Sequence, residues 1–362
     1  MGRFLFSESS KNLGGQELQI LLQMRMLQDA GHHAALACRA DSGIAREAAA
    51  RGLRSSASVF RPAGMVALRR LLRDERVDAA FCHSGHDALY MALAARLLPR
   101  RPLLIRVRTY QPGVPKAFGY NVLADRTLVH SEHMRRRVLA NPAIRPERIA
   151  VLRPVLPLAE IRAQARLPLP HALAAAVRGR KPVIVHAAML RPEKGHRTVL
   201  EAIAGLRGRY PGLLYVMAGA GPEEAALRRL AADLGLAEAV HFAGLVMPVS
   251  PLLALADLVI MPSLDEPLGL AQIEALALGV PVAVSDAGGL PETVEHGRTG
   301  WILPAGDAAA WTQGLAQALA DPARARAMAQ DGRRFVEATF APERFLDALG
   351  LQLEHARRQR GV

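Results

Sequence analysis

Residues 262–300 read PSLDEPLGLAQIEALALGVPVAVSDAGGLPETVEHGRTG, and this stretch decides the fold of the second half of the chain. A loop rich in Pro and Gly carries Glu266 and leads into an Ala-rich helix that carries Glu274. Gly279 ends the helix, because glycine tolerates the left-handed backbone conformation that commonly follows a helix. A short apolar strand then runs into a second glycine turn. A loop, helix, strand and turn in this order are typical of an α/β sheet.

The two glutamates of this stretch lie too far apart for the paired carboxylates of a glycoside hydrolase. If residues 266–274 were helical, eight steps of about 1.5 Å would separate the two Cα atoms by roughly 12 Å, whereas hydrolase carboxylates lie roughly 5 to 9.5 Å apart. Two separate roles fit better, with Glu266 facing a reacting sugar and Glu274 accepting hydrogen bonds from ribose hydroxyls. A surface helix with solvated glutamates is the alternative for either residue alone.

The start of the same helix predicts an anion site. Its first N–H groups have no partner within the helix and lie at the positive end of the helix dipole. The N–H groups of Gly269 and Leu270 belong to this set, and Pro267 removes one further donor from the loop. We therefore expect the helix start to bind a diphosphate.

The whole chain alternates between strands and helices, in two series. Strands are predicted at 3–7, 34–38, 79–83, 103–107, 126–129 and 149–152, and then at 183–187, 213–218, 240–243 and 258–261. Glycine turns follow the first strand of the first series, at Gly14 and Gly15, and the second strand of the second series, at Gly219. These glycines are predicted to contact the ligand, because the turns lie at the carboxyl ends of the strands, and a tight turn without a ligand is the alternative. The prediction is an α/β protein of two doubly wound, Rossmann-like domains, because 362 residues exceed the size of one core. Their expected bounds are 1–160 and 161–339, with a terminal helix at about 340–362 packing back on the first.

The charge of the chain is strongly positive, but it does not predict a nucleic-acid partner. The 46 Lys and Arg against 33 Asp and Glu leave a net charge of +13, and such an excess often accompanies nucleic acid, anionic membranes or acidic substrates. The excess is almost all arginine, a skew that genome base composition also produces. Aromatic residues are 4% of the chain, so no pattern of base-stacking side chains is present.

The predicted location is the cytoplasm, with any membrane contact peripheral to the inner face of the membrane. The N-terminal sequence lacks the apolar region of a signal peptide, and no apolar run is long enough to span a bilayer. Cys38 and Cys82 lie in apolar contexts and indicate reduced core residues. A predicted helix at 63–76 mixes apolar residues with arginines and is compatible with an anionic bilayer surface. The alternative is a domain helix with one solvated face.

These residues together resemble the family 4 glycosyltransferases, which are retaining enzymes of the two-domain GT-B fold and often build bacterial lipopolysaccharide or capsule. The resemblance covers most of the chain and is most specific in its second half. It rests on Lys194-Gly195, Gly219-Ala220-Gly221-Pro222, Pro262-Ser263 followed by Glu266 and Glu274, Gly279-Val280-Pro281-Val282 and Gly288-Gly289-Leu290-Pro291-Glu292. The resemblance implies that the two domains face a central cleft.

By this resemblance, Lys194 holds the diphosphate of a nucleotide-sugar donor, Glu274 holds the ribose, and Glu266 contacts the donor sugar near its reacting carbon. A leaving diphosphate gains charge as the sugar–oxygen bond breaks, so a preplaced cation stabilises the transition state more than the ground state. No cofactor or metal is expected, and the sequence contains no Asp-x-Asp motif.

The chain departs from the family pattern at two charged positions. Met189 occupies the place of the arginine that usually lies five residues before the lysine, and Arg191 is the predicted replacement. The turn at 106–110 lacks the family histidine that faces the donor sugar. His83, His86 and Arg108 are the candidates for the sugar side of the site, with a structural histidine as the alternative.

The sequence thus predicts a metal-independent, retaining glycosyltransferase that moves a sugar from a nucleoside-diphosphate sugar to a cell-envelope glycan, lipid-linked or free, in lipopolysaccharide, O-antigen or capsule biosynthesis. Two alternatives stay open. The departures at Met189 and Thr109 also fit a catalytically silent GT-B scaffold that binds a glycan or a partner transferase. A nicotinamide-dependent oxidoreductase is disfavoured, because neither glycine turn shows Gly-x-Gly-x-x-Gly with an acidic residue on the next strand.

Overall fold

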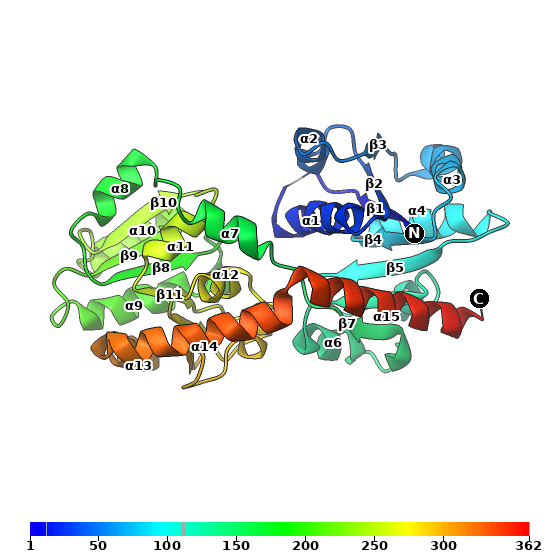
Figure 1. Ribbon diagram of the computed structural model, residues 1–362. Coiled ribbons are helices and arrows are strands. Elements are labelled where there is room, and N and C mark those ends of the chain that lie inside the picture. Colours follow the sequence, from blue (N-terminus) through cyan, green and yellow to red (C-terminus); the bar gives the residue numbers. More distant parts are fainter. Residues whose placement is uncertain (12, 111–112, 362) are drawn as a thin grey trace. The chain divides into compact units, whose positions relative to one another are not determined.

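The computed structural model describes residues 1–11, 13–110 and 113–361. The chain divides into two compact units (Figure 1). Unit 1 comprises Met1–Val155 with Pro342–Val362, and unit 2 comprises Leu156–Ala341. The division falls a few residues before the expected boundary at 160, and each unit contains one parallel sheet. The predicted α/β class with two doubly wound sheets is confirmed.

Unit 1 is built on a seven-stranded parallel sheet of order β3-β2-β1-β4-β5-β6-β7. Its strands are β1 (Arg3–Glu8), β2 (His33–Cys38), β3 (Ser55–Ala57), β4 (Ala79–Cys82), β5 (Leu103–Arg108), β6 (Arg126–Val129) and β7 (Ile149–Val151). Its helices are α1 (Gly15–Asp29), α2 (Gly43–Ala50), α3 (Met65–Asp74), α4 (Gly85–Arg96), α5 (Ala117–Asn121), α6 (Glu132–Leu139) and α15 (Pro342–Arg360), with short 3₁₀ turns η1 (Pro62–Gly64) and η2 (Pro146–Arg148). The edge strand β3 was not predicted, because it has three residues and none of them is an apolar residue larger than alanine.

Alternate residues of each strand in unit 1 enter hydrophobic cores on opposite faces of the sheet. On β1, Phe4 and Phe6 pack in a core with residues of α1, α2 and α15. Leu5 points the other way, into a core with residues of α3 and α4. Because both faces are covered, the strands are apolar along their whole length, as expected of a parallel sheet.

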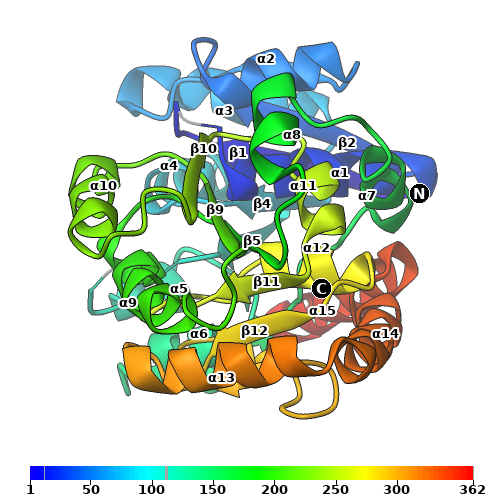
Figure 2. The same cartoon turned by 90° about the vertical axis from the view of Figure 1, so that its left-hand side faces the viewer.

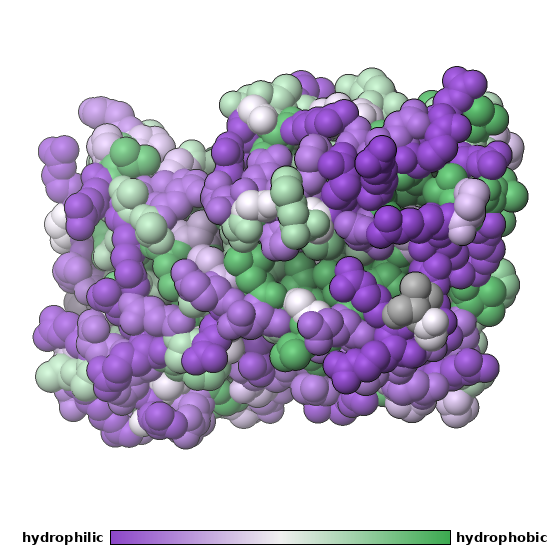
Figure 3. Space-filling view, turned by 45° about the vertical axis from the view of Figure 1, so that its right-hand side comes forward, coloured by the Kyte–Doolittle hydropathy of each residue, from purple (hydrophilic) through white to green (hydrophobic). Residues whose placement is uncertain are grey.

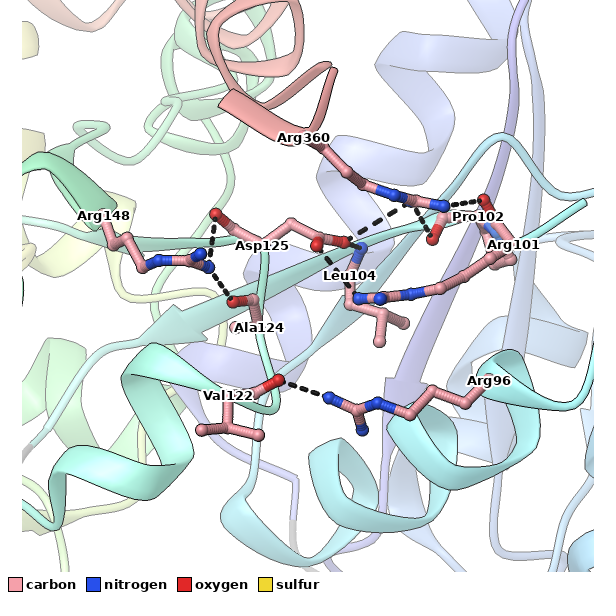
Figure 4. A network of polar contacts seen from close by, with 9 residues as sticks. All are labelled: Arg96, Arg101, Pro102, Leu104, Val122, Ala124, Asp125, Arg148 and Arg360. Atoms are coloured by element: carbon pink, nitrogen blue, oxygen red, sulfur yellow. Dashed lines mark hydrogen bonds and ion pairs between the residues drawn. The ribbon is translucent and has the colours of Figure 1, made fainter. Parts of the chain in front are cut away.

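The C-terminal helix α15 is part of unit 1 and is fixed at its end by Asp125 (Figure 4). The Asp125 carboxylate accepts hydrogen bonds from the Leu104 backbone N–H at 2.8 Å and from Arg101 at 2.9 Å. Arg360 lies 3.7 Å from the same carboxylate and donates to the carbonyl oxygens of Arg101 and Pro102. The last turn of α15 is thereby tied to the segment that enters β5.

Unit 2 is built on a six-stranded parallel sheet of order β10-β9-β8-β11-β12-β13. Its strands are β8 (Val183–Ala187), β9 (Leu214–Ala218), β10 (Val240–Gly244), β11 (Leu258–Met261), β12 (Val282–Ser285) and β13 (Trp301–Leu303). Its helices are α7 (Leu158–Gln164), α8 (His171–Val177), α9 (His196–Leu206), α10 (Glu224–Asp233), α11 (Ser250–Leu255), α12 (Ala271–Ala277), α13 (Ala308–Ala320) and α14 (Pro322–Phe340), with 3₁₀ turns η3 (Pro192–Lys194) and η4 (Leu290–Glu292).

Helices cover both faces of the unit 2 sheet, with α9 and α13 on one side and α11 and α12 on the other (Figure 2). On β8, Val183 and Val185 enter the core shared with α11 and α12, whereas Ile184 enters the core shared with α9 and α13. Trp311 of α13 is fully buried there. Both units therefore have the same three-layered plan.

Hydrophilic side chains dominate the face of the molecule drawn in Figure 3, and the hydrophobic residues on that face gather in recessed patches. Among the described residues, no helix combines the length and the hydropathy needed to cross a bilayer.

The strand order identifies where a ligand site is expected in each unit. In unit 1 the chain reverses its direction of winding between β1 and β4, and in unit 2 it does so between β8 and β11. Ligands of open α/β sheets bind outside the carboxyl ends of the strands at this switch point. The loops that follow β8 and β11 are the segments that carry Lys194 and Glu266.

Candidate functional site

The structure brings Lys194 and Glu266 together at the switch point of unit 2. Lys194 ends η3 in the loop after β8, and Glu266 lies in the loop after β11. The Lys194 Nζ lies 2.7 Å from the Glu266 Oε2, and the two side chains are only 18% and 11% exposed. The hydroxyl of Ser263 lies 3.4 Å from the same carboxylate oxygen. Two residues predicted to contact a donor thus form one partly desolvated ion pair.

Glycines allow the surrounding loops to approach Glu266 closely. Gly195 has a φ of +73°, and a Cβ there would lie 1.9 Å from the Pro262 carbonyl oxygen. Gly288 has a φ of +64°, and its Cβ would lie 2.0 Å from the carbonyl oxygen of Glu266. The N–H of Gly289 donates to that oxygen at 2.8 Å. These glycines therefore fix the backbone on both sides of the ion pair.

Gly219 has a similar packing role. A Cβ at Gly219 would lie 1.9 Å from the carbonyl oxygen of Ala188, in the loop that leads to Lys194. The next residue, Ala220, accepts a hydrogen bond from the N–H of Leu190 at 3.1 Å. Close packing of the backbone thus explains a glycine at position 219 without a ligand. Contact of Gly219 with the donor stays a prediction.

Glu274 is desolvated but has no protein partner among the described residues. It lies in the first turn of α12, whose N-cap is Leu270. The residue before the N-cap, Gly269, has a φ of +78°. No residue that the structure describes forms a hydrogen bond or an ion pair with its carboxylate. Loss of hydration by burial raises its pKa to about 7. A carboxylate held in this way is available to a ligand that brings its own hydroxyl donors.

Two histidines and a tyrosine form a buried hydrogen-bond network that contacts the loop of Lys194. His196 begins α9, and His186 lies on β8, with their ring centroids 4.0 Å apart. The Tyr215 hydroxyl lies 2.9 Å from His186 Nδ1 and 3.4 Å from His196 Nδ1. His196 Nε2 lies 3.2 Å from the carbonyl oxygen of Met189. None of these three side chains was predicted from the sequence to belong to the site.

The hydrogen bonds of this network determine the tautomers of both histidines. The Met189 carbonyl can only accept, so His196 carries its proton on Nε2 and its Nδ1 accepts from the Tyr215 hydroxyl. The tyrosine oxygen then accepts from His186 Nδ1, which leaves His186 Nε2 as an acceptor. That nitrogen is buried and has no hydrogen-bond partner. Burial lowers the pKa of His196 to about 4 and holds the pKa of His186 well below its usual value, so both are neutral at pH 7.

Arg191 is not part of the Lys194–Glu266 ion pair. Its side chain is half exposed, and its ion pair is a long one with Glu193, at 4.0 Å. Met189, at the position of the missing family arginine, is 50% exposed and contributes its backbone carbonyl to the histidine network. A role for Arg191 therefore requires a ligand within reach of an exposed guanidinium.

The predicted residues of unit 1 divide into buried and exposed groups. His83 is 4% exposed and its Nδ1 lies 3.1 Å from the Ser7 carbonyl oxygen, which favours the structural alternative, and its contact with a sugar stays a prediction. His86 is exposed in the first turn of α4. Arg108 is half-buried at the end of β5. Burial lowers the pKa of His83 to about 4.

The glycine turn of unit 1 is occupied by the helix cap of α1. The N–H of Gly14 donates to the Glu17 carboxylate at 2.8 Å, so it is not free for a phosphate. Gly15 is the first residue of α1 and is exposed. Contact of a ligand with Gly15 stays a prediction, whereas the Gly14 N–H already has a partner.

The structure also reveals two buried carboxylates that the sequence analysis missed. Glu8 ends β1 and accepts hydrogen bonds from the Ser10 N–H at 2.8 Å and from Gln16 at 2.6 Å. Asp87, in the first turn of α4, is fully buried, and burial raises its pKa to about 7. Its capping-box partner Ser84 lies three residues earlier, a spacing that the sequence displays.

With this geometry in place, comparison with known families identifies the class of the protein. Residues 13–160 match the family model "Glycosyltransferase Family 4", and residues 174–335 match the model "Glycosyl transferases group 1". The two matches together cover most of the chain. The chain belongs to the family 4 glycosyltransferases.

Curated relatives match mainly over part of their length. The chain is 40% identical over 166 residues to the GDP-mannose-dependent α-(1-6)-phosphatidylinositol monomannoside mannosyltransferase of Mycolicibacterium smegmatis, which is 43% of this chain and 44% of the relative. It is 34% identical over 167 residues to the lipopolysaccharide core biosynthesis glycosyltransferase LpsE of Rhizobium meliloti, 46% of this chain and 48% of the relative. The chain thus matches less than half the length of these two proteins.

Solved structures share the fold along the whole chain. HepE of Anabaena in complex with UDP and glucose has a TM-score of 0.81 and 19% identity, covering 98% of this chain and 100% of that one. A glycosyltransferase of Rickettsia africae has a TM-score of 0.84 and 18% identity, covering 98% of each chain. These likenesses confirm the predicted GT-B fold.

We predict that Glu274→Gln stabilises the protein at pH 8 and not at pH 4.5. Between its usual pKa of 4.5 and about 7, the folded protein keeps a proton on Glu274 that the unfolded chain has lost, so stability falls as the pH rises through this window. At about 1.4 kcal/mol per pH unit, the gain at pH 8 has an upper limit of roughly 3 kcal/mol. Urea unfolding at the two pH values measures it.

The control for this measurement is Glu201→Gln, on the exposed surface of α9. An equal gain at both pH values, or the same gain in the control, would show that the Glu274 carboxylate is not held in a desolvated environment.

We also predict that His186 and His196 carry their protons on different ring nitrogens. Long-range ¹H–¹⁵N spectra at pH 7 should show His186 protonated at Nδ1 and His196 at Nε2. Tyr215→Phe should lower the free energy of unfolding by about 1 to 3 kcal/mol, because it leaves buried ring nitrogens without partners. Tyr210→Phe, whose hydroxyl lies 3.5 Å from its carbonyl partner, is the control. Identical tautomers for the two histidines would contradict the network.

Proposed function

We propose that this protein is a retaining glycosyltransferase that moves a sugar from a nucleoside-diphosphate sugar to a glycan of the cell envelope. The observation that carries the proposal is the desolvated Lys194–Glu266 ion pair at the switch point of unit 2, in a chain of the family 4 glycosyltransferases. Glu274 is in the same loop and helix segment and is without a protein partner among the described residues.

The ion pair supplies opposite charges to the two ends of the bond that breaks. When the bond between the sugar carbon and the diphosphate oxygen cleaves, its electron pair leaves with the diphosphate, and the sugar becomes cationic. The Lys194 ammonium stabilises the first charge, and the Glu266 carboxylate stabilises the second. The acceptor oxygen then bonds to the same face of the sugar carbon, and its proton passes to an oxygen of the diphosphate. Configuration at the sugar carbon is thereby retained.

Glu274 holds the nucleoside in this proposal. Two ribose hydroxyls donate to its carboxylate and replace the water that burial has removed. The raised pKa implies that donor binding weakens below about pH 7, because the protonated carboxyl no longer accepts with full charge. No step requires a metal ion, so we expect turnover to persist in the presence of a chelator.

The relatives support a sugar nucleotide as donor and a cell-envelope molecule as acceptor. The mycobacterial relative uses GDP-mannose and acts on a phosphatidylinositol monomannoside, by its name, and LpsE acts in lipopolysaccharide core biosynthesis. HepE was solved with UDP and glucose. A product in lipopolysaccharide, O-antigen or capsule fits this set.

A peripheral contact with the inner face of the cytoplasmic membrane fits the surface of α3. Arg69, Arg70 and Arg73 are exposed on this helix, and Val66, which is 63% exposed, lies on the same side by its spacing. The opposite side, with Leu68 and Leu72, is buried in the core of unit 1. Such a helix face is suited to anionic lipid headgroups, and a lipid-linked acceptor would be found there.

A donor panel tests the proposed function directly. UDP-, GDP- and dTDP-sugars are added to the purified protein, and thermal unfolding and release of the nucleoside diphosphate are measured. We expect one nucleotide class to raise the melting temperature, because a ligand selective for the folded state stabilises it. We also expect slow release of the diphosphate without acceptor. Stabilisation without any release or transfer would indicate a silent scaffold. The absence of both stabilisation and release would refute the proposal.

We predict that Lys194→Ala lowers the turnover number about 100-fold, which is the usual cost of removing one group that stabilises a developing negative charge. The matched control is Lys181→Ala. Lys181 pairs with Asp257 at the same distance of 2.7 Å but is 71% exposed, so its loss should change turnover less than twofold. Steady-state kinetics with the donor identified by the panel measures both.

A second variant separates catalysis from folding. Lys194→Ala leaves the Glu266 carboxylate without its cation, so we expect lower stability as well. Lys194→Ala combined with Glu266→Gln removes that uncompensated charge and should regain stability but not turnover. If the turnover number of Lys194→Ala equals that of Lys181→Ala, Lys194 does not act on the donor.

A further inference from the structure

The loop that carries Lys194 is closed by a hydrogen bond between its start and the residue that follows its end. The loop runs from Ala188, after β8, to Gly195, before α9. The Nε2 of His196, the first residue of α9, lies 3.2 Å from the carbonyl oxygen of Met189 near the start of the loop. The two partners are seven residues apart in the chain, and Lys194 lies between them. This hydrogen bond therefore fixes the span of the loop that places Lys194.

Two further hydrogen bonds anchor the loop to its neighbours. The N–H of Leu190 donates to the carbonyl oxygen of Ala220 at 3.1 Å, in the turn after β9. The N–H of Leu264 donates to the carbonyl oxygen of Glu193 at 2.8 Å, which ties the loop to the segment after β11. Both bonds join backbone groups, whereas the bond to the Met189 carbonyl is made by a side chain. A single substitution can therefore remove the closing bond and leave the two anchors.

Buried neighbours hold the His196 ring in its orientation. His196 is 2% exposed, and His186 and Tyr215 are fully buried. The ring of His186 stacks on it at an interplanar angle of 28°, and the Tyr215 hydroxyl contacts its Nδ1. Because His186 and Tyr215 belong to the adjacent strands β8 and β9, the sheet itself fixes the direction in which His196 donates.

The network holds the loop without adding a second positive charge. Burial is the first cause that lowers the pKa of both rings, and the charge of Lys194 lowers it further, so this charge acts on both of them. By the same interaction a protonated ring would repel the Lys194 ammonium. Since both rings are neutral at pH 7, Lys194 remains the cation that pairs with Glu266.

We propose that His196 is a positioning residue for the transfer reaction, which closes the loop of Lys194 while Tyr215 and His186 hold its ring in place. It acts on the departure of the diphosphate, because Lys194 stabilises the charge of this group only from a fixed position. A displacement of about 1 Å at such a site can lower a rate about 100-fold. The proposal rests on the proposed function, because it assigns a role in the same reaction.

Two substitutions of His196 separate the roles of its two ring nitrogens. The amide of glutamine takes the place of Nε2 and can donate to the Met189 carbonyl, whereas the shorter amide of asparagine reaches only the place of Nδ1. Both variants lose the imidazole, but only His196→Gln keeps the closing hydrogen bond. The control is His171→Asn, because His171 is also the first residue of a helix of unit 2, α8, and is exposed.

We expect His196→Asn to lower the turnover number about tenfold and to change the Michaelis constant for the donor less than twofold. The Michaelis constant is spared because Glu274, the proposed ribose ligand, lies on α12 outside this network. The turnover numbers of His196→Gln and His171→Asn should stay within about threefold of the unsubstituted protein. Deuterium exchange of the backbone N–H groups of residues 188–195 should become faster in His196→Asn and not in His196→Gln.

A double-mutant cycle shows whether His196 acts through Lys194. His196→Asn is combined with Lys194→Ala, and turnover and urea unfolding are measured for all four proteins. If His196 positions Lys194, His196→Asn should change turnover less than twofold once Lys194 is absent. A purely structural role would give the same loss in both backgrounds. If His196→Asn does not fold, Tyr215→Phe takes its place in the cycle, because it removes the hydroxyl that holds the ring.

Three results would overturn the proposal: equal turnover in His196→Asn and His171→Asn, equal losses in His196→Asn and His196→Gln, or the same loss with and without Lys194. Failure of the proposed function is distinguishable from these, because the unsubstituted protein would then show no turnover, or Lys194→Ala would not lower it.

Discussion

The site of this protein depends on one interaction between two loops, the ion pair of Lys194 and Glu266. The two residues come from the ends of adjacent strands, β8 and β11, and their charges meet in a region from which most water is removed. A charge left alone in such a region is costly, so each residue requires the other. Glycines at 195 and 288 permit the backbone contacts that keep the loops at this separation. The two charges are thus held together within unit 2, and in the proposed reaction a donor meets both of them.

The carboxylates of Asp87 and Glu274 both have pKa values raised to about 7, but they differ in their hydrogen-bond partners. Asp87 accepts hydrogen bonds from both the N–H and the hydroxyl of Ser84 and from the Ser7 hydroxyl. It holds together the ends of β1 and β4. Glu274 is desolvated without any such partner among the described residues. The half-buried Glu274 carboxylate is therefore available to a ligand that brings its own hydrogen-bond donors.

Much of the fold was predictable from the sequence, because the strands of a doubly wound sheet are apolar along their length and alternate with helices at short spacing. The strands β3 and β13 were missed, since each has three residues and lies at an edge of its sheet. Lys194, Glu266 and Glu274 were selected from motif spacing. His83 was selected from its position after a strand, but the structure buries it against the Ser7 carbonyl. Spacing along the chain does not reveal on which side of a strand end a histidine points.

The class of the fold, the family and the charged residues of unit 2 could be predicted from the chain alone, because each follows from periodicity or from a motif that is continuous in the sequence. Which of these residues meet follows only from the three-dimensional fold. Lys194 and Glu266 are 72 positions apart, and their contact follows from the order of β8 and β11 in the sheet. The histidine pair under the Lys194 loop became visible for the same reason. Its hydrogen bonds go to Tyr215, which is distant in sequence, and short-range patterns carry no record of that neighbour.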